Sequence, residues 1–213
     1  NVVLGVDKNG LAFLRGSAWS FKFPNGPASN LFISLKVDTA GVLWAASGIN
    51  DRGTGFYSFD VSTPAGKQRI SYDVSTNPEL KFNDYYKVSL TTNNTKWVSS
   101  YGKGVARVDK KSAITVFDQN NSCLIGISNS PTFVVIGDVV PDRRGNTWMT
   151  VRSAANGNVL AVYRSDSTWF CLRNGLNPSI TLLTSMAVDL FDTKWIVSED
   201  PTQRGLIYMT DGG

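Results

Sequence analysis

The stretch Asp142-Arg-Arg-Gly-Asn-Thr-Trp148 is one of four versions of a short phrase that recurs along the chain. The other versions are Asp38-Thr-Ala-Gly-Val-Leu-Trp44, Thr91-Thr-Asn-Asn-Thr-Lys-Trp97 and Asp189-Leu-Phe-Asp-Thr-Lys-Trp195, and a weaker copy, Asp7-Lys-Asn-Gly-Leu-Ala-Phe13, lies near the first residue. The tryptophans follow one another at intervals of about 50 residues, and a repeat of about 40 to 50 residues built on strand-forming sequence is typical of propeller blades.

The polar residues of the phrase predict a tight turn between two strands. An Asp or Thr at the first position accepts hydrogen bonds from the backbone two or three residues on. The fourth position is Gly, Asn or Asp, the residues that adopt positive φ at least cost. We therefore interpret the repeat residues as structural, with the aromatic side chains in the core between blades. These residues are Asp38, Gly41, Trp44, Asn94, Trp97, Asp142, Gly145, Trp148, Asp189 and Trp195.

Each phrase is followed by the same series of strand-like segments. Small or β-branched residues come first, then a Gly-bearing loop and a second strand, for example over 104–108. Three repeats add a further strand, at 69–72, 114–117 and 169–172, and a strand such as 86–90 leads into each turn. Aromatic and β-branched alternation between Gly, Asn, Asp and Ser separators predicts antiparallel strands. Four such strands make a propeller blade, so the predicted fold is an all-β propeller without long amphipathic helices.

The repeats divide the chain into five blades or part-blades. Their boundaries are 1–37, 38–90, 91–140, 141–188 and 189–213. A propeller ring closes by pairing its last strand with its first, which removes the open sheet edges. Because the first repeat is short and the last lacks a strand, we expect a sector of a larger propeller within a longer multi-domain chain.

Composition excludes several classes of chemistry. The chain has no histidine, which removes Ser-His and Cys-His nucleophilic machinery and the usual His-bearing metal sites. No phosphate-binding Gly-rich motif follows a strand and opens a helix. Two acidic residues from distant blades could still form a glycosidase pair, but the sequence assigns none. We therefore predict no catalytic residue, no metal and no cofactor.

Charge and hydropathy limit the partners. The formal net charge is +4 and the basic residues are scattered, so they form no stripe for nucleic acid. A weak attraction to anionic polysaccharide or lipopolysaccharide remains consistent with this charge. No apolar run is long enough for a membrane span.

The two cysteines, Cys123 and Cys171, fit no metal or redox spacing. A disulfide is one interpretation. Buried free thiols that behave as small hydrophobic side chains are the preferred one.

The offsets Asp-x-x-Gly-x-x-Trp, followed by small residues, a Gly turn and a short strand, resemble the two-component-regulator propeller repeat (Reg_prop) of Bacteroidetes envelope proteins. The Thr-Lys-Trp forms at Trp97 and Trp195 are more similar to the branch with PorZ-type components of type IX secretion and surface proteins than to the sensor-kinase branch. Thr91, Asn94 and Asp192 depart from the pattern but keep its turn chemistry. The resemblance implies an exported, periplasmic or cell-surface protein, and it supplies no catalytic residue.

Three functions follow as hypotheses. The first is a non-catalytic scaffold or recognition module in secretion or surface attachment, with envelope or secretion-machinery proteins, or anionic polysaccharide or lipopolysaccharide, as partners. The second is the periplasmic ligand-sensing propeller of a hybrid two-component sensor kinase, and the third is a polysaccharide-active enzyme. Propellers bind ligands on the faces built by their loops, so the long loops 49–55, 62–68 and 198–204 are candidate binding segments.

Overall fold

The computed structural model describes residues 2–6, 10–22, 31–48, 50, 52–64, 67–91, 93–173, 175, 177 and 179–210. Within these residues the secondary structure is strands β1 to β18 and one 3₁₀ turn, η1, at Pro78–Leu80. The all-β prediction is therefore confirmed.

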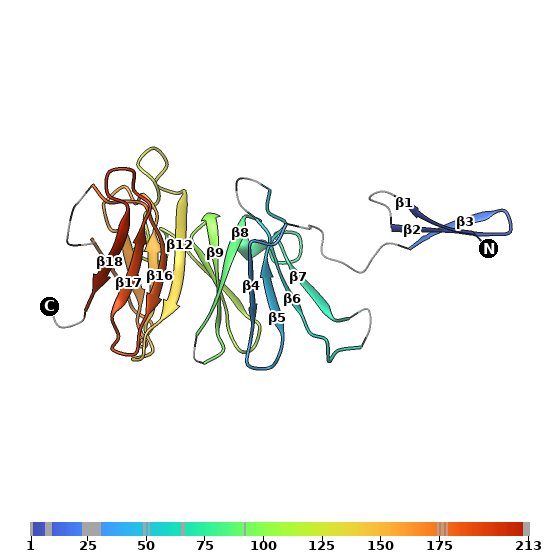
Figure 1. The fold of residues 1–213 in the computed structure, drawn as a ribbon, viewed down its shortest axis with the longest axis horizontal. Helices are drawn as coiled ribbons and strands as arrows, with labels where there is room; N and C mark the ends of the chain where they lie inside the picture. The colour runs from blue at the N-terminus through green and yellow to red at the C-terminus, as the bar shows by residue number, and fades with distance from the viewer. Residues whose placement is uncertain are drawn as a thin grey trace.

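Five successive groups of strands make up this part of the chain (Figure 1). The N-terminal sheet contains β1 (Val2–Val6), β2 (Gly10–Arg15) and β3 (Ala18–Lys22). The first blade contains β4 (Ser34–Val37), β5 (Leu43–Ala46), β6 (Phe56–Phe59) and β7 (Arg69–Tyr72). The second contains β8 (Tyr85–Leu90), β9 (Lys96–Gly102), β10 (Val105–Val108) and β11 (Ile114–Phe117). The third contains β12 (Val134–Pro141), β13 (Thr147–Val151), β14 (Leu160–Tyr163) and β15 (Trp169–Leu172). The fourth contains β16 (Leu183–Val188), β17 (Lys194–Ser198) and β18 (Gly205–Met209).

Each blade is an antiparallel meander in chain order, and the four blades lie side by side (Figure 1). Their leading strands β4, β8, β12 and β16 contact one another in sequence order. The second and third blades also share a short pairing, in which Val135 of β12 lies opposite Tyr101 of β9. This is the arrangement of successive propeller blades around a common axis.

The core lies between the blades. Successive residues of a strand point to opposite faces of its sheet. On β9, Val98 accordingly packs in the cluster between the first and second blades, whereas Trp97 packs in the cluster between the second and third. A third cluster, which includes Ile196, lies between the third and fourth blades. Both faces of an inner blade are therefore buried.

The four turn phrases have the predicted backbone. The fourth position of each phrase has positive φ, at Gly41, Asn94, Gly145 and Asp192. The first residue of each phrase pairs through its backbone N–H with the residue four positions on, as Asp38 does with the carbonyl of Val42 at 2.9 Å.

Cys123 and Cys171 form a disulfide with a Cα–Cα distance of 6.0 Å, so the expectation of free thiols is wrong. Leu124, the neighbour of Cys123, is buried in the cluster between the second and third blades, and Cys171 of β15 packs against the same cluster. The connection after β11 therefore runs beside the outermost strand of the third blade, and the bond joins the two. A period of about 50 residues does not reveal this proximity, because it aligns blades without placing their connections.

Candidate functional site

The turn phrases of the first and third blades do more than reverse the chain, because each of these two also contacts the next blade. Asp38 accepts hydrogen bonds from the backbone N–H groups of Ala40 and Val42 through Oδ1, at 2.9 and 3.1 Å. Its Oδ2 accepts from Trp44 Nε1 and pairs with Lys96 Nζ of the second blade, both at 3.1 Å. Lys96 Nζ also lies 5.0 Å from the centre of the Trp44 ring. The Asp38 carboxylate thus contacts the backbone of its own turn, the indole of its own blade and the lysine of the next blade.

The junction between the third and fourth blades repeats the indole contacts of this arrangement. Trp148 Nε1 donates to Asp142 Oδ2 at 3.0 Å, and Lys194 Nζ of the fourth blade lies 4.7 Å from the Trp148 ring centre. The lysine that covers each indole is the residue directly before the tryptophan of the following blade. We call each such set an Asp–Trp–Lys unit.

The carboxylates of these units are held in their charged form. Burial opposes ionisation of Asp38, but the hydrogen bonds from Lys96, Trp44 and the turn backbone outweigh it and lower its pKa. Asp142 shows the same balance: burial raises its pKa, and the donors Asn146 and Trp148 and the turn backbone bring it below the ordinary value.

A second contact links the turns themselves. The backbone N–H of Thr39 in the first blade donates to Asn94 Oδ1 of the second, at 3.4 Å. In the same way, the N–H of Arg143 in the third blade donates to Asp192 Oδ1 of the fourth, at 3.0 Å. Where Asn or Asp takes the left-handed position of a turn, its side chain therefore reaches back to the preceding blade.

The junction between the second and third blades has substitutions at all three of the corresponding positions. Thr91 replaces the aspartate, Thr147 replaces the lysine, and Gly145 has no side chain to reach the preceding turn. A cavity of about 220 Å³ opens there. We call it the middle pocket; it is lined by Thr91, Asn93, Thr95, Trp97, Arg107, Pro141, Gly145, Thr147, Tyr163, Arg164, Ser165 and Ser167.

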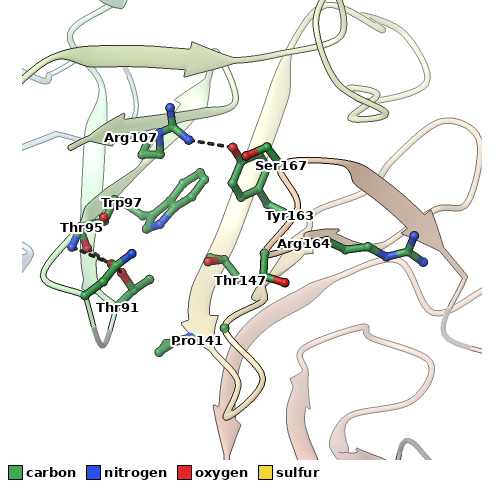
Figure 2. Close-up of a pocket in the computed structure, with 12 residues that line it drawn as sticks. Thr91, Thr95, Trp97, Arg107, Pro141, Thr147, Tyr163, Arg164 and Ser167 are labelled. Atoms are coloured by element: carbon green, nitrogen blue, oxygen red, sulfur yellow. Dashed lines mark hydrogen bonds between the residues drawn. The ribbon is translucent and has the colours of Figure 1, made fainter. Parts of the chain in front are cut away.

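Arg107 of β10 reaches across the blade junction beside the middle pocket (Figure 2). Its Nη1 donates to the Tyr163 hydroxyl at 2.7 Å. The guanidinium carbon lies 5.4 Å from the centre of the Phe117 ring and 5.5 Å from that of Tyr163. Its Nε is buried and has no hydrogen-bond partner in the described part of the chain. The two rings and the Tyr163 hydroxyl therefore hold the guanidinium at the blade junction.

The pocket is polar and carries positive charge. Threonine and serine hydroxyls and one asparagine amide form much of its wall, and no lining residue is acidic. The side chain of Arg164 extends away from Arg107 in Figure 2, and its guanidinium lies 4.9 Å from the Phe170 ring centre. Arg107 is thus the pocket-lining cation whose guanidinium lies at the blade junction, beside Tyr163.

A second cavity, of about 310 Å³, lies beside the leading strands, with Tyr86, Lys87, Arg152 and Glu199 among its lining residues. Lys87 is neutralised there by Asp138 of the next blade, at 2.7 Å. Asp138 also accepts the backbone N–H of Met186 in the fourth blade at 2.9 Å, so it joins three blades.

The repeat tryptophans differ in their surroundings. Trp44 and Trp97 are buried, Trp148 is partly buried, and Trp195 is 37% exposed although its Nε1 donates to Asp189 at 2.9 Å. None of the three predicted loop segments lines the middle pocket; Glu199 of the segment 198–204 lines the second cavity, and residues 49, 51, 65 and 66 lie outside the described residues. Sequence reasoning missed Arg107 and Tyr163, because their pairing across blades leaves no local motif.

The described residues contain no group of His, Cys, Asp or Glu that could hold a metal ion. In the same part of the chain, none of the helical structure is long and apolar enough to cross a membrane.

No protein-family model and no curated protein sequence matches the chain. Solved structures do. PorZ, a surface component of the type IX secretion system of Porphyromonas gingivalis, aligns with a TM-score of 0.70 and 21% identity over 97% of this chain and 29% of its own. The extracellular domain assigned to a hybrid two-component system of B. thetaiotaomicron aligns with a TM-score of 0.61 and 14% identity over 95% of this chain and 25% of its own.

The chain has the β-propeller fold. It spans less than a third of the length of either of these proteins. Virginiamycin B lyase from Staphylococcus aureus shares the fold more distantly, with a TM-score of 0.55 and 10% identity over 85% of this chain and 56% of its own. At these identities the similarity establishes the fold alone.

Proposed function

We propose that this propeller is a non-catalytic recognition and scaffold module of an exported bacterial envelope protein, with a role like that of the PorZ-type propellers. The observation that carries the proposal is the similarity to a surface component of type IX secretion over 97% of the chain. The second similarity, to an extracellular domain, supports an exported location. Its partners are envelope or secretion-machinery proteins, or anionic polysaccharide or lipopolysaccharide.

The structure of the blade junctions supports a binding role over a catalytic one. A cationic, hydroxyl-lined pocket is suited to holding a polar ligand. Its lining residues include no His, Asp, Glu, Cys or Lys that could activate one of the hydroxyls as a nucleophile. The virginiamycin B lyase becomes catalytically inactive when one histidine is replaced by alanine. This chain contains no histidine, so the same chemistry has no counterpart here.

A ligand-sensing propeller of a hybrid two-component sensor is the second candidate, and the similarity to the B. thetaiotaomicron domain favours it. The two functions differ in what surrounds the propeller. A gene that also encodes a membrane span and a histidine kinase would establish the sensor, and a gene that encodes a type IX secretion signal would establish the surface component.

Biolayer interferometry tests the recognition function directly. The purified chain is passed over immobilised lipopolysaccharide from a Bacteroidetes outer membrane and over neutral dextran at several salt concentrations. We expect saturable binding to the lipopolysaccharide that weakens as salt rises, and none to dextran. Equal binding to both surfaces, or turnover of a glycan substrate, would overturn the proposal.

A further inference from the structure

The middle pocket exists because one junction lacks the contacts that close the other two. At the first junction, Lys96 fills the space beside Trp44 and pairs with Asp38. At the third, Lys194 covers Trp148. At the second junction both partners are changed together, to Thr91 and Thr147, and neither threonine can span the gap that a lysine spans.

The positive charge at the second junction comes from Arg107 and not from a lysine beside the tryptophan. Arg107 approaches from β10, a strand further out than the lysine positions, and its guanidinium is held by the rings of Phe117 and Tyr163. It forms no ion pair with any described acidic residue, and none of the pocket-lining residues is acidic. A partly buried cation without a carboxylate beside it favours binding of an anion.

The shape and chemistry of the pocket narrow the class of anion. A guanidinium presents parallel N–H donors in one plane, which match the two oxygens of a carboxylate. The remaining wall supplies hydroxyls from Thr95, Thr147, Ser165 and Ser167, each able to donate and to accept. The Thr91 hydroxyl donates within its own turn and can still accept. A cavity of about 220 Å³ has room for more than an inorganic ion, and a ligand with several hydroxyls would satisfy this wall.

From these contacts we infer that the middle pocket binds the carboxylate of a sugar acid, with Arg107 as the carboxylate ligand and the threonine and serine hydroxyls around the ring. Tyr163 is a positioning residue, since its hydroxyl fixes one guanidinium nitrogen. The inference rests on the proposed recognition function and assigns a site and a ligand class to it.

Isothermal titration with glucuronate and with glucose tests the inference on the full chain. Glucuronate is expected to bind and glucose, which has the same ring without the carboxylate, is not. Arg107→Gln should weaken glucuronate binding by about tenfold or more, because a charge-assisted bidentate contact is lost. Arg107→Lys should also weaken it, because the charge remains but the planar donor pair does not. Arg173→Gln, at an exposed arginine that does not line the pocket, is the matched control and should bind as the wild type does.

The double variant Thr91→Asp/Thr147→Lys recreates at the middle junction the pair that the first junction contains. It should fold, with a melting temperature at least that of the wild type, and it should lose glucuronate binding because the new pair fills the pocket and supplies the missing carboxylate. Because this variant leaves Arg107 and its aromatic neighbours intact, it keeps the inference testable if Arg107→Gln fails to fold.

Equal affinity for glucose and glucuronate, unchanged binding by folded Arg107→Gln, or unchanged binding by the folded double variant would each overturn the inference. Binding of acetate with the affinity of glucuronate would overturn the assignment to a sugar acid. The interferometry result separates the two proposals. Lipopolysaccharide binding without glucuronate binding would overturn the assignment of the pocket and keep the recognition function. Glucuronate binding without lipopolysaccharide binding would keep the pocket and exclude lipopolysaccharide as the partner.

Discussion

The indole of Trp97 lies at the middle junction, where it is 2% exposed and stacks on Phe117 with ring centres 5.9 Å apart. Trp97→Ala is expected to lower the free energy of unfolding by about 3 to 5 kcal/mol, because it leaves a large cavity in a packed core. Urea denaturation followed by circular dichroism measures the change. Trp195→Ala is the internal comparison, and its effect should be smaller because that indole is 37% exposed. Equal losses of unfolding free energy in the two variants would show that the burial of a repeat tryptophan does not determine its contribution to stability.

We expect the free energy of unfolding to depend on pH through the ionisation of Asp38. Its folded pKa is lower than its unfolded value of about 3.9, because the hydrogen bonds from Lys96, Trp44 and the turn outweigh the effect of burial. A lowered pKa means that the stabilisation is fully present above the unfolded pKa and is lost as pH falls through the folded pKa. Wild type should therefore exceed Asp38→Asn in unfolding free energy at pH 6, with the difference shrinking below about pH 4. A difference that stays constant from pH 6 to pH 3 would contradict this.

The turn phrases show how far residue-level prediction reaches. The types at the fourth position predict positive φ, and Asn94 and Asp192 have it. Their second role, as acceptors for the N–H groups of Thr39 and Arg143, depends on residues roughly 50 positions away, and no rule for local turns contains it.

At the scale of the elements, the disulfide joins β15, the outer strand of the third blade, to the connection that follows β11. The disulfide between Cys123 and Cys171 closes a loop with a sequence separation of 48. On the chain-entropy model, a loop of that length is expected to contribute about 4 kcal/mol. The double variant Cys123→Ser/Cys171→Ser should lose a comparable amount in urea denaturation, and wild type treated with a reductant should match it. A midpoint unaffected by either change would indicate that the unfolded chain is already restricted in this region.

The strands themselves were largely readable from the sequence. The predicted third strands at 69–72, 114–117 and 169–172 coincide with β7, β11 and β15. Their alternation and turn separators are local properties, so a single sequence contains them. The disulfide and the middle pocket join residues from different blades or connections, and the spacing of the repeat does not specify these contacts.

At the scale of the whole molecule, the two end faces of the array of four blades expose apolar side chains, whereas the inner faces are covered. The fourth blade exposes Trp195, Val197, Leu206 and Tyr208. At the other end, the first blade has an apolar groove of about 290 Å³, with Phe32, Leu35, Tyr57 and Phe59 among its lining residues. Inner faces of the same kind are covered by the next blade.

Because large exposed apolar faces favour association, we expect copies of this chain to associate head to tail as concentration rises. Sedimentation velocity over a range of concentrations measures this. Leu206→Glu, which places a charge on a residue that is 62% exposed, should shift the distribution toward the monomer without lowering the melting temperature. Sedimentation coefficients independent of concentration in the wild type would contradict the prediction.

The Asp–Trp–Lys units also restrict how such a gene can be rearranged. Each unit takes its carboxylate from one blade and its cation from the next, as Asp38 and Lys96 do. Deletion of the second blade would bring Thr147 opposite Asp38 and leave a buried carboxylate without its lysine, a costly arrangement. Duplicating or exchanging a blade therefore requires a matching change in its neighbour, so positions 91 and 147 should change together in evolution, and the order of the blades is inherited as a unit.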